Sequence, residues 1–295
     1  MNLMCPARLV LLPLGGATWA DQLTGERVSV VYAGAEVGGA AELAERLGAM
    51  LSVLPDAVRD LQAIADLHRG ETVVVVGPEV GVDLPAVVEH TGDDWSVVSS
   101  LDANTVTLAA YEQRAESFAS TIPRAPNENL IRLVDEALPA GGDVLELGSG
   151  TGRDAAELER RGHRVRRTDA TLAFLEMMRA DGFSADRLNA LTDDYGGPYD
   201  VVFADAVFLH FTPDQLSTVL TKCAKAAPLL AFSTREGDGV EWSDRSLELP
   251  RHFRCWQEEP LRVLLAQTGW QVLQVRRGQT RSGGWLHVLA EVVDA

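Results

Sequence analysis

The residues of this chain that could do chemistry begin where one short apolar segment ends. Residues 143–147 predict a buried strand, and Glu146 within it is followed by glycines at alternate positions, Gly148, Gly150 and Gly152. A glycine turn between a parallel strand and a helix lets a ligand touch the backbone, because no Cβ is in the way and positive φ is accessible. The pattern therefore predicts a site for a nucleoside-like ligand.

The next stretch predicts the second half of the same unit. Residues 153–161 predict a helix, and residues 163–168 predict a strand that ends at Asp169, 21 residues after Gly148. In nucleotide-binding folds an acid at about this separation holds a pair of ribose hydroxyls. Asp169 is therefore the predicted ribose-binding residue.

The register of the glycines distinguishes two kinds of nucleoside site. A dinucleotide site reads G-x-G-x-x-G, but counted from Gly148 the third glycine position holds Arg153. The acid-led pattern E-x-G-x-G-x-G instead resembles motif I of class I S-adenosylmethionine-dependent methyltransferases. Their cofactor, S-adenosyl-L-methionine, has no phosphates and carries a cationic sulfonium, so an acid such as Glu146 is tolerated. A glycine turn without a ligand and a nicotinamide or flavin site are the alternatives.

The resemblance extends from about Tyr111 to the end of the chain. It is strongest in the stretches GSGTGRDA, TDAT and PRHF-x-x-W-x-EEPLR. It implies an α/β fold with a Rossmann-like sheet of seven strands. The strands expected after Asp169 are 199–204, 229–233, 271–277 and 285–293, and the helices are 172–180, 212–226 and 258–268. The stretch AKAAPLL departs from the Pro-Gly-Gly turn usual in the family, outside the expected cofactor pocket.

The resemblance also implies which residues hold the cofactor. They lie in the motif, after the following strand and on flanking segments: Tyr111, Glu146, Gly148, Ser149, Gly150, Gly152, Arg153, Asp169, Ala170, Asn189 and Asp205. Tyr111 belongs to a predicted helix, 109–125, that would cover the methionine end of the cofactor; ordinary linker packing is the alternative. Asn189 or Asp186 would lie beside the adenine amino group, unless this stretch is an ordinary surface loop.

Two candidate catalytic residues follow the strand 199–204. Ligands of doubly wound sheets lie outside the carboxyl ends of the strands, so this segment is expected to face the methyl group. Asp205 would accept a hydrogen bond from the cofactor's amino group or the substrate, or else cap the following turn. His210 would remove a proton from the nucleophile. Because methyl transfer is an in-line displacement, alignment can provide most of the acceleration and a base is optional.

A long connection, residues 234–256, is the expected substrate wall, because loops of this length in compact domains are usually functional. The first candidates are Arg235, Trp242, His252 and Trp256. For Trp256 the alternative is that its side chain only pins the loop to the core.

The first hundred residues predict a separate small α/β domain with a parallel sheet, including a helix at 85–90 and a final strand within 97–108. Its order resembles the histidine phosphatase (phosphoglycerate mutase-like) superfamily over residues 7–110, in the stretches LLPLGGATW, VYAGAEVGGAAELAERLG and GETVVVVGPEV. The position of the nucleophilic histidine holds Leu14, its arginine neighbour is Pro13, and the second histidine's position holds Pro78. Phosphoryl transfer through a phosphohistidine needs an imidazole and a cluster of cations. The resemblance therefore implies a degenerate, catalytically silent phosphatase fold whose role is a scaffold, a dimer surface or a lid.

Composition agrees with a two-domain enzyme of the cytoplasm. The 295 residues divide into the expected domains 1–108 and 127–295, joined by a helical linker or lid at 109–126. Acidic residues outnumber basic ones 43 to 26, giving a formal charge of −17 that disfavours nucleic acid as a partner. Three widely spaced cysteines predict reduced thiols, and the scattered histidines predict no metal site. No signal peptide and no membrane span are expected, and a homodimer is possible.

The sequence thus favours a methyltransferase acting on a small molecule or short peptide, by O-, N- or S-methylation in specialised metabolism, behind a silent phosphatase-like domain. A cofactor-binding protein without turnover that recruits a partner is the alternative. Residual phosphatase action on a phosphorylated metabolite is a third.

Overall fold

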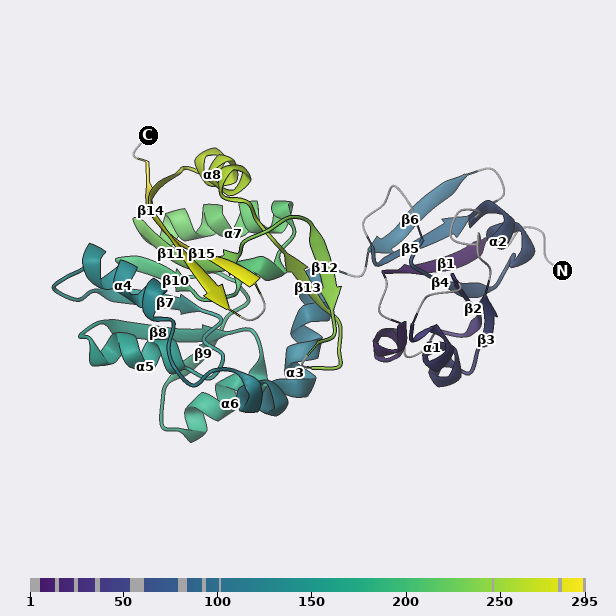
Figure 1. The fold of residues 1–295 in the computed structure, drawn as a ribbon, viewed down its shortest axis with the longest axis horizontal. Helices are drawn as coiled ribbons and strands as arrows, with labels where there is room; N and C mark the ends of the chain where they lie inside the picture. Colours follow the sequence, from purple (N-terminus) through teal and green to yellow (C-terminus); the bar gives the residue numbers. More distant parts are fainter. Residues whose placement is uncertain are drawn as a thin grey trace. The chain divides into compact units, whose positions relative to one another are not determined.

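The computed structural model describes residues 6–13, 16–23, 26–34, 38–53, 61–78, 84–91, 94–100, 102–245, 247–280 and 283–293. The chain divides into two compact units, whose helices and strands are labelled in Figure 1. The first unit is Met1–Val106 together with Trp242–Arg251, and the second is Thr107–Glu241 together with His252–Ala295. The expected boundary at residue 108 lies close to this division, but the segment 242–251 belongs to the first unit rather than to the predicted domain 127–295.

The first unit is built around a six-stranded sheet in the order β3-β2-β4-β1-β5-β6. Its strands are β1 (Ala7–Leu12), β2 (Val28–Ala33), β3 (Met50–Val53), β4 (Thr72–Val76), β5 (Ala86–His90) and β6 (Trp95–Ser100). Its helices are the 3-10 helix Gly16–Leu23, α1 (Ala40–Leu47) and α2 (Leu61–Leu67). Strands β1 to β4 are parallel, whereas β5 and β6 are antiparallel to their neighbours. The predicted parallel α/β layer therefore holds for four of these six strands.

The predicted helix at 85–90 is wrong, because β5 occupies these residues and pairs antiparallel with β1. Val87 and Val88 explain the difference: they are adjacent β-branched residues that pack into two separate core clusters, one on each face of the sheet. Alternation between faces is the period of a strand, and five residues are too few to reveal it by pattern alone. The final strand is β6, but the predicted strand region 97–108 is wrong for residues 103–108, which begin α3 (Ala103–Thr121). Helix α3 therefore starts before the predicted helix 109–125 and also ends before residue 125.

The second unit contains a seven-stranded sheet in the order β14-β15-β11-β10-β7-β8-β9, as the resemblance implied. Its strands are β7 (Asp143–Leu147), β8 (Arg164–Asp169), β9 (Ala185–Arg187), β10 (Val201–Ala204), β11 (Leu229–Arg235), β14 (Trp270–Thr280) and β15 (Gly283–Val292). Its helices after α3 are α4 (Glu128–Ala137), α5 (Arg153–Arg160), α6 (Leu172–Ala180), α7 (Pro213–Ala226), α8 (Glu258–Gln267) and the 3-10 turn Phe208–His210. Strand β15 pairs antiparallel with both β14 and β11, whereas the other neighbouring strands of this sheet pair in parallel.

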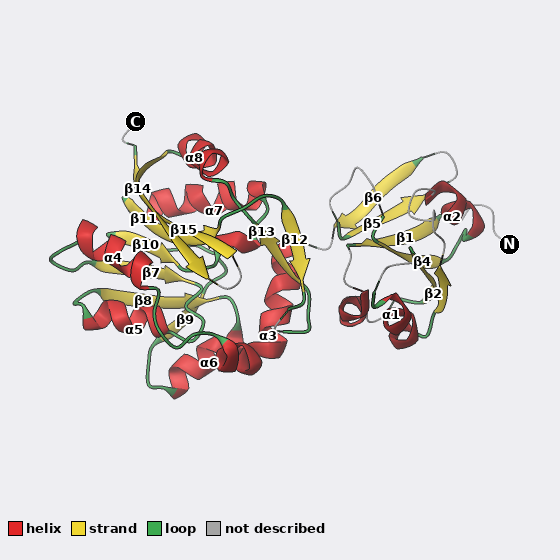
Figure 2. Cartoon of the chain, in the orientation of Figure 1, coloured by secondary structure: helices red, strands yellow, loops and turns green. Residues whose placement is uncertain are grey.

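Helices cover both faces of this sheet, and the strand period decides which residue meets which layer (Figure 2). Val144 of β7 packs with residues of α4 and α5, whereas Leu145 and Leu147 pack with residues of α7 and α8. Side chains alternate between the faces of a strand, so a strand buried on both sides is apolar throughout. This packing fixes the carboxyl ends of β7, β8 and β10 along one edge of the sheet, because the three strands are parallel.

The predicted long connection 234–256 contains two further strands. They are β12 (Val240–Ser243) and β13 (Arg251–Arg254), which pair as a separate two-stranded sheet. Within the part of the chain that is described, no helix is both long and apolar enough to cross a membrane.

Candidate functional site

The three glycines after β7 form a loop that only glycine can build. All three have positive φ angles, 65° at Gly148, 55° at Gly150 and 75° at Gly152. A Cβ at Gly148 would lie 2.6 Å from a methyl group of Val207, and one at Gly152 would lie 3.2 Å from Met178. At Gly150, however, a Cβ would meet no atom within 4 Å. The loop is therefore packed at its two ends and open at its centre, where its backbone can meet a ligand.

Asp169, at the end of β8, lies directly beside this loop. Its two carboxylate oxygens accept hydrogen bonds from the backbone N–H groups of Gly150 (2.9 Å) and Thr171 (2.8 Å). Burial raises the pKa of Asp169, while the bonds from the two amides oppose that rise. Ser149 links the loop to β8, because its hydroxyl accepts a hydrogen bond from the N–H of Thr168 (3.1 Å). The structure thus brings together the acid and the glycines that the sequence predicted as one site.

Glu146 is buried under the loop, with 2% of its surface exposed. Burial, together with the nearby Asp154 carboxylate, raises the pKa of Glu146 to about 8. One of its carboxylate oxygens, Oε2, is buried and has no hydrogen-bond partner. Buried polar atoms are nearly always paired in proteins, so an orphaned carboxylate oxygen beside an open loop is suited to a cationic ligand group.

Asp205, after β10, is enclosed by three donors. Its Oδ1 accepts hydrogen bonds from the Asn127 amide (2.6 Å) and the Ser233 hydroxyl (2.6 Å), and its Oδ2 accepts from Arg153 (2.9 Å). Arg153 also contacts Asp154, whose pKa burial and the Asp205 charge raise to about 6. Asp205 therefore joins the start of α4, the start of α5 and the end of β11, and it does not cap the turn that follows it.

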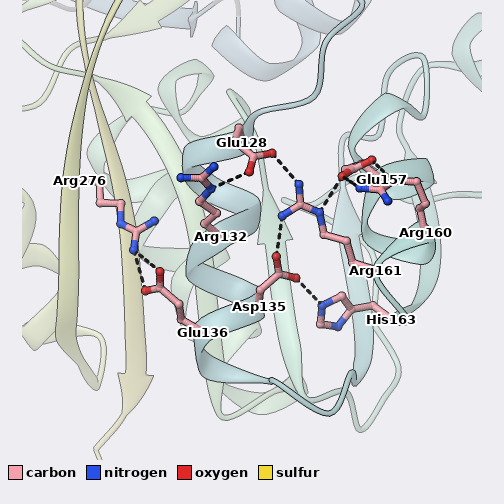
Figure 3. Close-up of polar contacts among 9 residues, drawn as sticks. All are labelled: Glu128, Arg132, Asp135, Glu136, Glu157, Arg160, Arg161, His163 and Arg276. Carbon is pink, nitrogen blue, oxygen red and sulfur yellow. Dashed lines mark hydrogen bonds and ion pairs between the residues drawn. The ribbon is translucent and has the colours of Figure 1, made fainter.

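A network of ion pairs holds α4 against α5 (Figure 3). Helix α4 is the helix whose N-cap is Asn127. Arg161, which follows α5, donates to Glu128 (2.6 Å), Asp135 (2.6 Å) and Glu157 (2.7 Å). Asp135 also lies 3.2 Å from Nε2 of the buried His163. Glu128 and Asp135 belong to α4 and Glu157 to α5, so one arginine links both helices that flank the glycine loop.

His210 and Tyr111 meet at the same edge of the sheet. The Tyr111 hydroxyl lies 3.0 Å from His210 Nε2, and the ring of Tyr111 packs against Phe118 and against Phe174 of α6. His210 Nδ1 lies 2.7 Å from the backbone oxygen of His252. The structure thus brings a predicted cofactor-binding residue, a predicted catalytic residue and a predicted substrate residue into one cluster.

The other predicted substrate residues lie in different parts of the structure. The guanidinium of Arg235 lies 4.7 Å over the ring of Phe253, which also packs against His210, so Arg235 belongs to the same cluster. Trp256 is 5% exposed and is part of the core around α7 and α8, in agreement with the pinning alternative. Trp242 packs in the first unit, where its ring lies 5.0 Å from that of Trp19.

The two remaining predicted residues lie in turns. Ala170 is in the turn between β8 and α6 and is half-buried. The side-chain oxygen of Asn189 accepts from the backbone N–H of Leu191 (2.9 Å), which forms an Asx turn after β9. Among the described residues, no group of three or more His, Cys, Asp or Glu side chains is arranged to hold a metal ion.

Two residues of the site were not predicted. Asn127 could have been found, because it stands where an N-cap is expected before the helix 128–137. Glu112 of α3 accepts from the backbone N–H groups of Leu172 (2.7 Å) and Ala173 (3.1 Å), and so it caps α6 from another helix. No local pattern reveals that cap, because the partners are separated by about sixty positions in the chain.

The solved structures with a similar fold include several methyltransferases. Magnesium protoporphyrin IX methyltransferase from Synechocystis PCC 6803, crystallised with bound SAM, has a TM-score of 0.53 and 16% identity over 66% of this chain and 99% of its own. The 1,6-didemethyltoxoflavin-N1-methyltransferase of Burkholderia thailandensis has a TM-score of 0.54 and 18% identity over 73% of this chain and 99% of its own. The CcbJ methyltransferase of Streptomyces caelestis has a TM-score of 0.51 and 17% identity over 63% of this chain and 98% of its own. A search of curated proteins gave no significant match.

The sequence itself matches the family model of the methyltransferase domain over residues 118–275, which is more than half of the chain. The matched segment contains the glycine loop, Asp169, Asp205 and His210. The protein therefore belongs to the methyltransferase domain family.

Proposed function

We propose that the protein is an S-adenosylmethionine-dependent methyltransferase that methylates oxygen, nitrogen or sulfur of a small molecule or short peptide. The observation that carries this proposal is the open backbone at Gly150, which donates to the carboxylate of Asp169 and follows the strand that contains the buried Glu146. S-adenosylmethionine carries a sulfonium, an ammonium group and a ribose but no phosphate, so it suits a site lined by carboxylates.

The residues present fit this cofactor. Asp169 would accept bonds from the ribose hydroxyls, Glu146 would meet the amino group of the methionine end, and the backbone at Gly150 would lie against that end. When bound, S-adenosylmethionine supplies an electrophilic methyl group. The solved structures of similar fold include complexes of other enzymes with S-adenosylmethionine and S-adenosylhomocysteine, which supports the assignment.

Two observations support a small acceptor. The similar enzymes are named for small acceptors, magnesium protoporphyrin IX and 1,6-didemethyltoxoflavin. The formal charge of −17 disfavours nucleic acids, whose phosphates it would repel. Production of a labelled methylated metabolite from labelled cofactor would establish turnover, whereas a protein that only binds the cofactor would give none.

We also infer that the first unit does not transfer phosphoryl groups. Strands β1 and β4 are adjacent and parallel, and the described residues at their carboxyl ends include Pro13 and Pro78, which cannot act as nucleophiles. Leu14, at the expected nucleophile position, lies outside the described residues. The full chain is expected to release no phosphate from 4-nitrophenyl phosphate, and measurable release would contradict this inference.

The cofactor proposal is tested by calorimetric titration with S-adenosylhomocysteine. Asp169→Asn keeps one of the two acceptor oxygens but removes the charge, so affinity is expected to fall about 10- to 100-fold, the value of a charge-assisted hydrogen bond. Asp143→Asn is the matched control, because Asp143 starts β7 at the opposite edge of the sheet and pairs with Arg164. Unchanged affinity in Asp169→Asn, or no binding by the wild type, would overturn the proposal.

A further inference from the structure

The imidazole of His210 is held in one tautomer. A backbone carbonyl only accepts hydrogen bonds, so the 2.7 Å contact of Nδ1 with the His252 oxygen requires the proton on Nδ1. In the neutral ring, Nε2 then carries a lone pair, and the Tyr111 hydroxyl 3.0 Å away donates to it. Both ring nitrogens are therefore engaged, and the nitrogen that can take up a proton faces Tyr111.

His252 repeats the same bond in the opposite direction. Its Nδ1 donates to the backbone oxygen of His210 (3.0 Å), and its backbone N–H donates to the Thr107 hydroxyl (3.0 Å). His210 is 8% exposed and His252 4% exposed, and the ring of His210 packs at 4.8 Å from that of Phe253. The reciprocal pair fixes the position of the imidazole without using Nε2.

We propose that the acceptor gives its proton to Tyr111 and that His210 is the base behind it, with His252 as a positioning residue; this rests on the proposed function. A phenol oxygen can accept one hydrogen bond while it donates another, so it can pass a proton on. Tyr111 is half-buried and packs against α6, the helix that follows the ribose-binding Asp169. The hydroxyl of Tyr111 lies between His210 Nε2 and an acceptor, so a proton reaches His210 through Tyr111.

Methylation of a neutral acceptor releases one proton. The heteroatom of the acceptor forms a bond to the methyl carbon, and the carbon–sulfur bond breaks with its electron pair moving to sulfur. The proton of the acceptor moves to the Tyr111 oxygen as the Tyr111 proton moves to His210 Nε2. The resulting imidazolium keeps its Nδ1 bond to His252 and afterwards loses the proton to water through Tyr111. Such a relay serves an acceptor that is neutral at pH 7 and carries an O–H or N–H group.

The first test needs neither cofactor nor acceptor. In ¹⁵N NMR spectra of the full-length protein, His210 is expected as the Nδ1–H tautomer, and Tyr111→Phe is expected to shift the resonance of Nε2. His252→Leu keeps the backbone oxygen to which His210 donates but removes the Nδ1 bond to the His210 oxygen, so it should leave the tautomer in place and shift the ring resonances of His210. His252→Asn, which keeps a donor at the same place, should restore them. An Nε2–H tautomer in the wild type, or no response to Tyr111→Phe, would overturn the relay.

The second test measures methyl transfer into a metabolite extract. Tyr111→Phe keeps the ring contacts with Phe118 and Phe174, and it is expected to lower the rate at pH 7 about 100-fold, the usual contribution of proton transfer. The loss should shrink at higher pH, where the acceptor ionises by itself. Tyr32→Phe is the matched control, because it removes a similar tyrosine–histidine bond (2.7 Å, to His68) in the first unit.

The two tests separate this proposal from the proposed function. A Tyr111→Phe rate equal to that of the wild type at pH 7 would refute the relay while leaving the methyltransferase intact. If the wild type binds no S-adenosylhomocysteine and forms no methylated product, the proposed function fails instead, whatever tautomer His210 has.

Discussion

The charge of Glu146 depends strongly on its surroundings. Burial raises its pKa to about 8, so the side chain is neutral in the free protein at pH 7. A cationic ligand group beside Oε2 would favour the ionised form, and binding would then release a proton. Below pH 8 this release opposes binding, and the opposition weakens as the pH rises.

We therefore expect the affinity for S-adenosylhomocysteine to increase between pH 6 and pH 8, by at most about tenfold per pH unit. Calorimetry in buffers of different ionisation enthalpy would measure the proton released. Glu146→Gln retains any titration of the ligand itself and is expected to flatten the remaining pH dependence. An identical pH dependence in wild type and variant would show that Glu146 does not meet the cation.

Glu146→Gln is expected to weaken binding but to stabilise the folded protein. A carboxyl whose pKa is raised on folding makes the native state less stable as the pH rises from its ordinary value near 4.5 to about 8, because only the unfolded chain loses the proton in that window. At pH 8, ligand-free Glu146→Gln is therefore expected to unfold at a higher temperature than the wild type. Glu146 would then be retained for binding at a cost in stability.

Asp205 marks the limit of sequence interpretation at the residue scale. Its place after β10 suggested contact with a cofactor or substrate, and that role remains a prediction. The fold gives it three donors, from Asn127, Arg153 and Ser233. These partners come from α4, α5 and β11, and no spacing in the sequence reveals that they converge on one carboxylate.

At the scale of elements, α3 is attached to the start of α6, the helix that follows Asp169. Glu112 accepts from the first two backbone N–H groups of α6, whose own N-cap, Thr171, makes no side-chain cap. The helix dipole also favours a carboxylate at this end. Glu112, the residue after Tyr111, therefore attaches α3 to the start of α6.

Glu112→Ala is expected to destabilise the start of α6 by about 1 kcal/mol, the usual contribution of a helix cap. Amide hydrogen exchange at Leu172 and Ala173 would measure this directly, as a rate increase of about fivefold for 1 kcal/mol. Glu116→Ala, an exposed glutamate one turn later on α3, is the matched control. Equal exchange in both variants would contradict the cap.

Local patterns predicted most elements of the seven-stranded sheet and its helices closely, but they missed β9 and placed the start of α3 at residue 109 instead of Ala103. Helix α6 occupies the predicted residues 172–180, and α7 begins at Pro213 behind a Thr212 capping box. These helices carry start and stop signals in their own residues. The strand β5 is only five residues long and lacks such signals, so its pairing with β1 decided its conformation.

At the scale of the whole molecule, the two units are not consecutive in the chain. Residues 242–251 leave the second unit and complete the first one, where the Trp242 ring packs against Trp19 and its Nε1–H donates to the Leu84 oxygen (2.9 Å). Leu247 and Leu249 of the same segment are also buried. Trp242 was predicted to line the substrate site, but its observed contacts are those of a core residue.

Trp242→Ala in the full-length chain is expected to destabilise the first unit by about 2–3 kcal/mol, because it removes a half-buried aromatic side chain and a hydrogen bond. Urea unfolding followed by the fluorescence of Trp19 would show an earlier transition. Trp285→Ala, on β15 of the second unit, is the control that should leave this transition unchanged. An unaltered transition in Trp242→Ala would mean that the inserted segment does not support the first unit.

The sequence by itself determined the glycine loop, the acid that ends β8 and the order along the chain of the strands that carry them. Backbone conformation and the burial of a strand depend mainly on a few neighbouring residues. The residue types of the segment were therefore enough to predict positive φ at the three glycines and a strand that is buried on both faces. Tertiary structure alone decided which distant side chains meet: His210 with a tyrosine 99 positions earlier and a histidine 42 positions later, and Trp242 with the first unit. Those contacts depend on the path of the chain through the folded molecule, which the spacing of residues along the sequence does not reveal.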